Sequence, residues 1–234
     1  MPRQIQPLDE CLKIGRARLH PSIFNPNYLV LRGRAEIFSA WLKVKSGAGW
    51  QVLDIGGRYQ PYRPLLDGRE QNYFAIDLVQ TPLVNVVAES QMLPFDSQVF
   101  DLVISTQTFE YFEQPQVAAA EVLRVMKFGA CFLMSVASFA PQFAPEERWR
   151  YLPAGLKTLL KAFSSVELIP ETGSIGTFFR ILNLYLTSLT PGWVRQTLTY
   201  TVVPVLNLLG WHLDRVIRSL APQFVANYSV LAIK

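Results

Sequence analysis

A short apolar segment that runs into two glycines is the part of this sequence best suited to bind a ligand. Residues 52–57 read VLDIGG, and Asp77 ends the next apolar segment. Glycines let the backbone turn sharply and approach a bound nucleotide, and a carboxylate after the second strand can accept hydrogen bonds from both ribose hydroxyls. The pattern favours nucleotide binding at this turn. The alternative is a tight strand-to-helix turn followed by an unrelated surface aspartate.

Further motifs follow in a fixed order along the chain. They are LPF at 93–95, FDLVIS at 100–105, EVLRVMKFG at 121–129, RWRY at 148–151, and Gly155 with Leu156. Together, residues 51–160 resemble the class I S-adenosylmethionine-dependent methyltransferases, and are similar to the small methyltransferase-domain proteins of the type 11 group. The resemblance implies a Rossmann-like fold, S-adenosylmethionine as cofactor and methyl transfer as the reaction.

The resemblance also implies where the cofactor binds. Asp54 would organise the glycine turn and the amino-acid end of the cofactor, and Asp77 would hold the ribose. Glu89 stands where the family usually has an aspartate near the adenine amino group. Ser105 and Gln107, just past the fourth strand, would line the methionine side, with ordinary loop polarity as the alternative. The implied set is Asp54, Gly56, Gly57, Arg58, Asp77, Leu78, Glu89, Ser90, Ser105 and Gln107.

Two loops depart from the family pattern, at two positions each. Arg58 and Gln60 stand where glycine is usual. Arg58 must therefore point away from the ligand or contact it, and its guanidinium could pair with the carboxylate of the cofactor. The alternative is a surface arginine. Phe128 and Ala130 replace the commoner proline and glycine before the fifth strand, which alters the stiffness of that loop and not its chemistry.

Catalysis of methyl transfer requires mainly that the acceptor, the methyl carbon and the sulfur be held in line. Methyl transfer from a sulfonium is an in-line displacement, so a base is needed only for an acceptor such as a hydroxyl. Relatives often carry Glu-His after the fourth strand, whereas this chain has Glu110 and Tyr111. These two and His20 are the candidate catalytic residues, with packing or surface roles as the alternative. The candidate acceptor-binding residues, for which packing under a lid is the alternative, are Tyr111, Trp149, Arg150 and Tyr151.

Alternating strands and helices must position these residues. Strands are expected at 51–55, 73–77, 84–87, 101–105, 131–136, 165–169 and 227–233, and helices at 28–43, 117–126 and 155–162. Such alternation indicates a parallel sheet built from βαβ units. With the family resemblance, it predicts an α/β, Rossmann-like, mostly parallel seven-stranded sheet with helices on both faces, an antiparallel last strand and a helical insertion before it.

The length of 234 residues suits one domain. We expect a helical cap at 1–45, a nucleotide-binding core at 50–170, a helical insertion at 171–224 that shapes the acceptor site, and a final strand at 225–234. Large apolar side chains in the insertion point to a hydrophobic or lipid-linked acceptor, with core burial as the alternative.

Composition narrows the location and the partners. The net charge is +4, but its Lys and Arg are dispersed, so nucleic acid is not an expected partner. Cys11 and Cys131 form no CxxC pair, which predicts no metal site and favours a reduced, cytoplasmic compartment. Residues 1–18 do not resemble a secretory signal. Pro191 and Pro204 interrupt the apolar stretch at 175–213, which favours helices that pack on the domain or rest on a membrane surface over a spanning helix.

The leading hypothesis is thus a methyltransferase that acts on a small-molecule or saccharide acceptor, lipid-linked forms included. A catalytically degenerate binding or assembly module is the main alternative, because Arg58, Gln60 and Tyr111 all depart from the family. A nicotinamide-dependent oxidoreductase would need a full G-x-G-x-x-G loop directly after the strand, and this chain has none.

Overall fold

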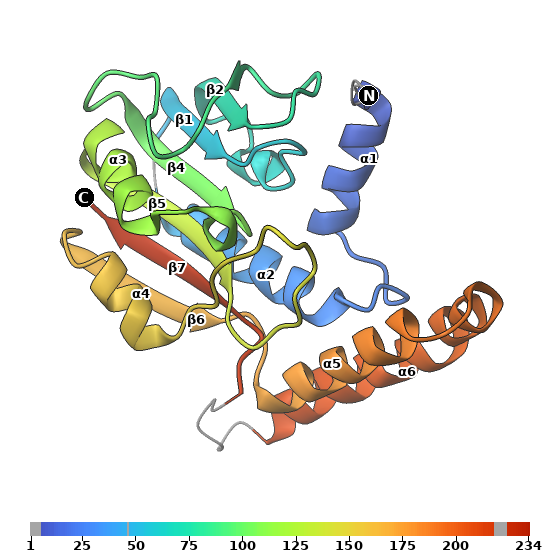
Figure 1. Ribbon diagram of the computed structural model, residues 1–234. Coiled ribbons are helices and arrows are strands. Elements are labelled where there is room, and N and C mark those ends of the chain that lie inside the picture. Colours follow the sequence, from blue (N-terminus) through green and yellow to red (C-terminus); the bar gives the residue numbers. More distant parts are fainter. Residues whose placement is uncertain (1–5, 46, 218–223) are drawn as a thin grey trace.

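The centre of the computed structural model, which describes residues 6–45, 47–217 and 224–234, is a seven-stranded sheet in the order β3-β2-β1-β4-β5-β7-β6 (Figure 1). The strands are β1 (Trp50–Ile55), β2 (Glu70–Asp77), β3 (Val86–Val87), β4 (Phe100–Thr106), β5 (Met126–Ala137), β6 (Ser165–Pro170) and β7 (Asn227–Ile233). The pairs from β3 to β5 are parallel, and β7 is antiparallel to both β5 and β6. The predicted fold class is confirmed.

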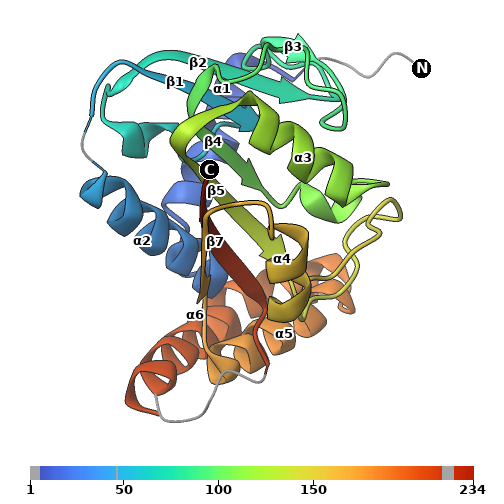
Figure 2. The same cartoon turned by 90° about the vertical axis from the view of Figure 1, so that its left-hand side faces the viewer.

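Helices cover both faces of the sheet, as Figure 2 shows with α2 on one side and α3 and α4 on the other. The helices are α1 (Leu8–Leu19), α2 (Tyr28–Val44), α3 (Pro115–Val125), α4 (Pro153–Leu159), α5 (Ser174–Ser188) and α6 (Gly192–Val216). Alternate residues of one strand enter different cores: Leu53 joins the cluster that contains α3, and Val52 joins the cluster that contains α2. This alternation explains why the central strands read as continuous apolar runs.

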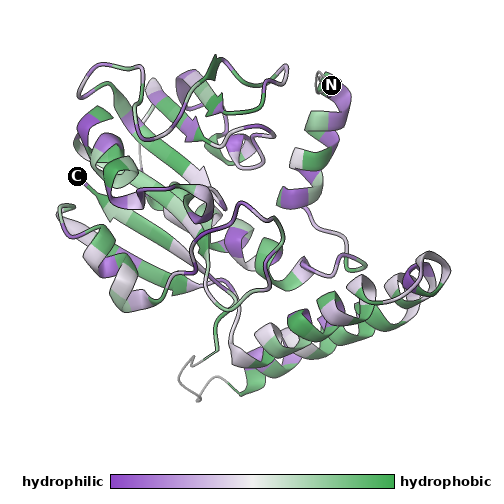
Figure 3. Ribbon diagram, viewed as in Figure 1, coloured by the Kyte–Doolittle hydropathy of each residue, from purple (hydrophilic) through white to green (hydrophobic). Residues whose placement is uncertain are grey.

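The long segment between β6 and β7 forms a hairpin of two helices, α5 and α6, which projects from the sheet in Figure 1. Asn183 of α5 donates to Asn207 of α6 over 3.0 Å in the buried contact between the two helices. Hydrophobic residues extend along both helices (Figure 3). Among the described helices, none combines the length and the apolar character needed to cross a membrane.

Some expected element boundaries differ from the observed ones by several residues. Residues 1–5 of the expected cap and 218–223 of the expected insertion lie outside the described residues. The helix expected at 117–126 ends at Val125, and the following strand begins at Met126, five residues earlier than the expected strand at 131–136.

One edge of the sheet gathers the ends of most strands. The parallel strands β1, β2, β4 and β5 all finish there, and antiparallel pairing places the start of β7 and the end of β6 at the same edge, with Ala137 opposite Asn227 and Pro170 opposite Tyr228. In sheets of this type, ligands bind beyond the carboxyl ends of the strands, where the strand order reverses between neighbours. Here that point lies between β1 and β4.

Candidate active site

The turn after β1 depends on two glycines. Gly56 has φ +76°, and the N–H groups of Gly56 and Gly57 both donate to the carbonyl of Ile76, over 2.9 and 3.1 Å. A Cβ on Gly56 would lie 2.3 Å from Thr108 Oγ1, and one on Gly57 would lie 2.8 Å from the carboxyl carbon of Asp54. The glycines therefore let the ends of β1 and β2 and the loop after β4 approach one another.

Asp54 packs against the glycine turn. Its side chain is buried, it accepts a 2.7 Å hydrogen bond from the hydroxyl of Tyr73, and it lies against Gly57. Burial raises the pKa of Asp54 from its ordinary value to about 7, and the nearby carboxylate of Asp77 acts in the same direction.

Arg58 pairs with a carboxylate of the chain itself. Its Nη2 lies 2.8 Å from Oδ1 of Asp77, the carboxylate expected to hold ribose. The same oxygen accepts the backbone N–H of Val79. The side chain of Arg58 is one-third exposed, so it can leave this contact for solvent.

Gln60 occupies the second position where glycine is usual. It has φ +44°, a left-handed conformation that glycine adopts readily. Its amide donates to the carbonyl of Leu83 over 2.6 Å and accepts from Arg63 over 3.1 Å. The loop thus keeps a glycine-like backbone while a buried side chain fills the space.

Three further residues of the expected cofactor site, Leu78, Glu89 and Ser90, follow β2 and β3. Leu78 comes directly after β2 and is exposed, and Glu89 follows β3 and is also exposed. Ser90 beside it is buried. Because β2 and β3 are parallel neighbours, these residues come after the same strand ends as Asp77.

Ser105 and Gln107 lie at the end of β4, but Gln107 turns toward β5 and β7. Its backbone N–H donates to the carbonyl of Ser135, its side chain reaches Ser135 Oγ at 3.1 Å, and its amide faces that of Asn227 at 3.2 Å. Ser105 is buried, and its hydroxyl has no hydrogen-bond partner among the described residues.

Glu110 links three segments at this edge, from the short 3-10 helix Phe109–Tyr111. Its Oε1 accepts the N–H of Ala137 at the end of β5, and its carbonyl accepts the N–H groups of Arg148 and Trp149. Its Oε2 is buried without a partner among the described residues. Burial raises the pKa of Glu110 to about 7.

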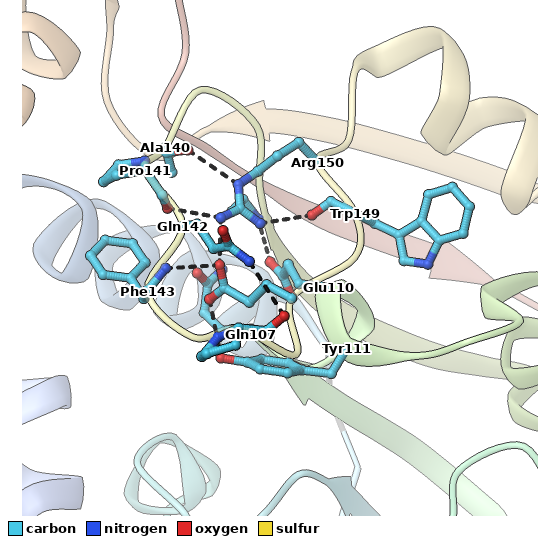
Figure 4. Close-up of polar contacts among 12 residues, drawn as sticks. Gln107, Glu110, Tyr111, Ala140, Pro141, Gln142, Phe143, Trp149 and Arg150 are labelled. Atoms are coloured by element: carbon cyan, nitrogen blue, oxygen red, sulfur yellow. Dashed lines mark hydrogen bonds and ion pairs between the residues drawn. The ribbon is translucent and has the colours of Figure 1, made fainter.

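The loop at 138–152 closes over this edge, and Arg150 holds it together (Figure 4). The guanidinium of Arg150 donates to the carbonyls of Ala140, Pro141 and Trp149 and pairs with Glu147. The arginine expected to bind the acceptor thus has its donors engaged by its own loop.

The other candidate acceptor and catalytic residues take varied positions. The hydroxyl of Tyr111 donates to Glu147 over 3.1 Å, and that of Tyr151 donates to the carbonyl of Phe109 over 2.9 Å. The indole N–H of Trp149 donates to the carbonyl of Phe112, while its ring is partly exposed. His20 is exposed at the end of α1.

Sequence reasoning missed a buried polar network beneath the loop. Arg34 of α2 forms a two-point contact with Glu171, 2.8 and 2.9 Å long, and Ser135 and Ser229 donate to the same carboxylate. Arg180 of α5 is buried close by. The available signal was a charged residue within an apolar stripe, since Arg34 lies between the buried residues Val30 and Phe38 of α2.

Comparison with known proteins finds one matching family model and several similar folds. Residues 53–134 match the family model of a methyltransferase domain. No curated protein sequence matches the chain.

Three solved structures illustrate the fold similarity. A putative sarcosine dimethylglycine methyltransferase from Galdieria sulphuraria has a TM-score of 0.55 at 12% identity, covering 87% of this chain and 88% of that one. An S-adenosylmethionine-dependent methyltransferase from Mesorhizobium loti has 0.54 at 15% identity, with 86% and 98% coverage. The [4+2]-cyclase SpnF has a TM-score of 0.53 at 15% identity, with 86% and 80% coverage.

At such low identity, these structural likenesses establish the fold alone, and the family match applies to residues 53–134. That match spans β1 to β5 and includes the glycine turn, Asp77 and Glu110. The identification thus extends to residues 53–134, which are similar to a methyltransferase domain of the type 11 kind.

Proposed function

We propose that this enzyme transfers the methyl group of S-adenosylmethionine to a small-molecule or saccharide acceptor, lipid-linked forms included. The observation that carries the proposal is the meeting of the glycine turn after β1 with Asp77 at the end of β2, inside the segment that matches the methyltransferase domain. When bound, the cofactor supplies an activated methyl group on its sulfonium.

The residues at the turn fit this cofactor once Arg58 moves. In the proposed complex, Asp77 holds the ribose hydroxyls, and Asp54 keeps the glycine turn in place. The Arg58–Asp77 pair is partly exposed, and such pairs are worth only about 0–1 kcal/mol. Two ribose hydroxyls can replace the guanidinium at little net cost.

Glu110 is the proposed proton acceptor for a hydroxyl substrate. It follows β4, one oxygen is fixed by Ala137, and the other has no partner among the described residues. A pKa of about 7 suits a general base at neutral pH, because the carboxylate is available and still takes up a proton readily.

The hairpin of α5 and α6 supports a hydrophobic or lipid-linked acceptor. Exposed aromatic and aliphatic side chains lie along it: Phe178, Tyr185, Leu189, Trp193, Tyr200, Val205, Leu208 and Leu209. Such a surface can rest against a membrane from the cytoplasmic side, through residues 175–213. In this proposal the chain works as one domain, with the hairpin serving the acceptor side.

The competing proposal is a binding or assembly module that has lost catalysis. The contact of Arg58 with Asp77 favours it, since the cation occupies the carboxylate that ribose would need. Similarity to a [4+2]-cyclase also shows that proteins with this fold are not all methyltransferases by name.

Calorimetric titration of the full chain with S-adenosylmethionine tests the two proposals. We expect binding to the unmodified protein, and Asp77→Ala should weaken it by about 1–3 kcal/mol because hydrogen bonds to a charged partner are lost. Asp96→Ala, which removes an exposed aspartate elsewhere, is the matched control and should bind normally. A chain that binds no S-adenosylmethionine would support the degenerate module, and unchanged affinity in Asp77→Ala would remove Asp77 from the site.

A further inference from the structure

The inward face of α5 is unusually polar. Thr177, Arg180, Asn183 and Thr187 are all buried on it, at spacings of three and four residues. Thr177 fixes this face to the sheet, because its hydroxyl accepts the N–H of Ala226, the residue before β7, over 2.9 Å. Arg180, three residues further along α5, therefore lies close to the edge where the strands end.

Arg180 has few partners for a buried cation. Only 3% of it is exposed, and its Nε donates to Asn27 Oδ1 over 2.9 Å. Its Nη1 is buried without a hydrogen-bond partner among the described residues. Phe143 of the loop at 138–152 lies against it, with the guanidinium carbon 5.8 Å from the ring centre.

The nearby carboxylates are already committed. Glu171 is held by both branches of Arg34 and by two serine hydroxyls, and Glu147 is paired with Arg150. Burial lowers the pKa of Arg180 to about 10; the carboxylate of Glu171 acts in the opposite direction, and the neighbouring cations Arg34 and Arg150 lower the pKa as burial does. An uncompensated buried charge is costly, so such a group is expected where a ligand supplies the opposite charge.

Other unpartnered atoms lie at the same edge. Ser105 Oγ and Glu110 Oε2 are buried without hydrogen-bond partners among the described residues. They come from the end of β4 and from the segment after it. Buried polar groups are normally paired, so several unpaired ones along one edge indicate a polar ligand or ordered water there.

We propose that Arg180 binds an anionic group, a carboxylate or a phosphate, of the methyl acceptor. The inference rests on the proposed methyl transfer and narrows its acceptor to an anionic molecule. Arg180 stands on the β5–β7–β6 side of the edge, whereas Asp77 stands on the β1–β2 side. Between them lie Glu110 and the loop that Arg150 holds, so an acceptor anchored at Arg180 extends toward the proposed base.

Thermal unfolding of the full chain with inorganic phosphate or acetate tests this proposal, with chloride at matched ionic strength as the reference. At an anion concentration about ten times the dissociation constant, the unfolding temperature should rise by roughly 3–6 °C. The more effective anion identifies the group as phosphate or carboxylate. Arg180→Gln should abolish the rise, and Arg195→Gln, which removes an exposed arginine of α6, should retain it.

An equal rise in Arg180→Gln, or no rise in the unmodified chain with either anion, would overturn the proposal. If Arg180→Gln fails to fold, as judged by circular dichroism, Arg180→Lys takes its place. It keeps the charge but loses the two-point fork, so anion affinity should fall several-fold, and unchanged affinity would refute the assignment.

The same variants separate this inference from the proposed function. Arg180→Gln should bind S-adenosylmethionine as the unmodified chain does, because Arg180 stands on the other side of the edge from Asp77. Loss of cofactor binding in the unmodified chain would defeat the proposed function, whatever the anion result. Normal cofactor binding without anion binding would defeat only the present inference.

Discussion

Arg58 and Gln60 stand at two positions where related enzymes usually have glycine, and the fold accommodates them differently. Gln60 keeps the left-handed backbone and buries its amide, whereas Arg58 reaches across to Asp77. The type of residue at both positions could be read from the sequence, but the partner of Arg58 could not. A long cation can reach many carboxylates, and the fold decides which one is near.

Removing the Arg58 side chain should improve cofactor binding. Arg58→Ala frees Asp77 for ribose, and because the lost ion pair is partly exposed, affinity for S-adenosylmethionine should rise by up to about fivefold in calorimetry. Arg16→Ala, an exposed arginine of α1, controls for the change in net charge. Weaker binding in Arg58→Ala would mean instead that Arg58 contacts the cofactor, for example by pairing with the carboxylate of the cofactor.

Glu110 should make stability depend on pH. Its pKa is about 7 in the folded chain, above the ordinary value near 4.5, so the folded state holds the proton to higher pH. The contribution of Glu110 to the free energy of unfolding is therefore fully present below about pH 4.5 and is lost as the pH rises to 7. Glu110→Gln cannot lose a proton and so does not show this loss. Between pH 5 and pH 8, the free energy of unfolding of the variant in urea should therefore rise by roughly 1–3 kcal/mol relative to that of the unmodified chain. If the difference in free energy of unfolding between the two chains did not depend on pH, the pKa of Glu110 would not be raised, and its proposed role as base would be weakened.

Strands and helices were largely predictable, and the loop above the active-site edge was not. Apolar runs between turn residues located the strands, since each central strand has both faces buried. The early start of β5 escaped prediction because residues 126–129 carry no apolar alternation, while Gly129, with φ +76°, lies within the strand. The path of the loop at 138–152 depends on Arg150 and Glu147, whose contacts span the loop and leave no periodic signal.

Glu147 should control the order of that loop. It accepts from Phe143, Arg150 and Tyr111, so Glu147→Ala removes three restraints at once. We expect faster hydrogen exchange across 138–152, corresponding to about 1–3 kcal/mol of lost local stability. The exposed neighbour provides the control, since Glu146→Ala should exchange like the unmodified chain. Equal protection in both variants would show that Arg150 holds the loop without Glu147.

Across the whole molecule, the strand order places two separate groups of polar residues at the edge where the strands end. The tips of β1 and β2 carry the glycine turn and Asp77, while the tips of β5, β7 and β6 meet α5 and the Arg34–Glu171 network. The first half could be anticipated because its motif is contiguous in sequence. The second half joins residues from α2, β5, α5 and β7, which only the folded chain brings together.

The structure of the full chain with bound S-adenosylhomocysteine would test the central claim most directly. We predict that the ribose hydroxyls contact the carboxylate of Asp77, that Arg58 has moved away from it, and that the glycine turn keeps its path. An intact Arg58–Asp77 contact, with the ligand bound elsewhere, would contradict the proposed cofactor site.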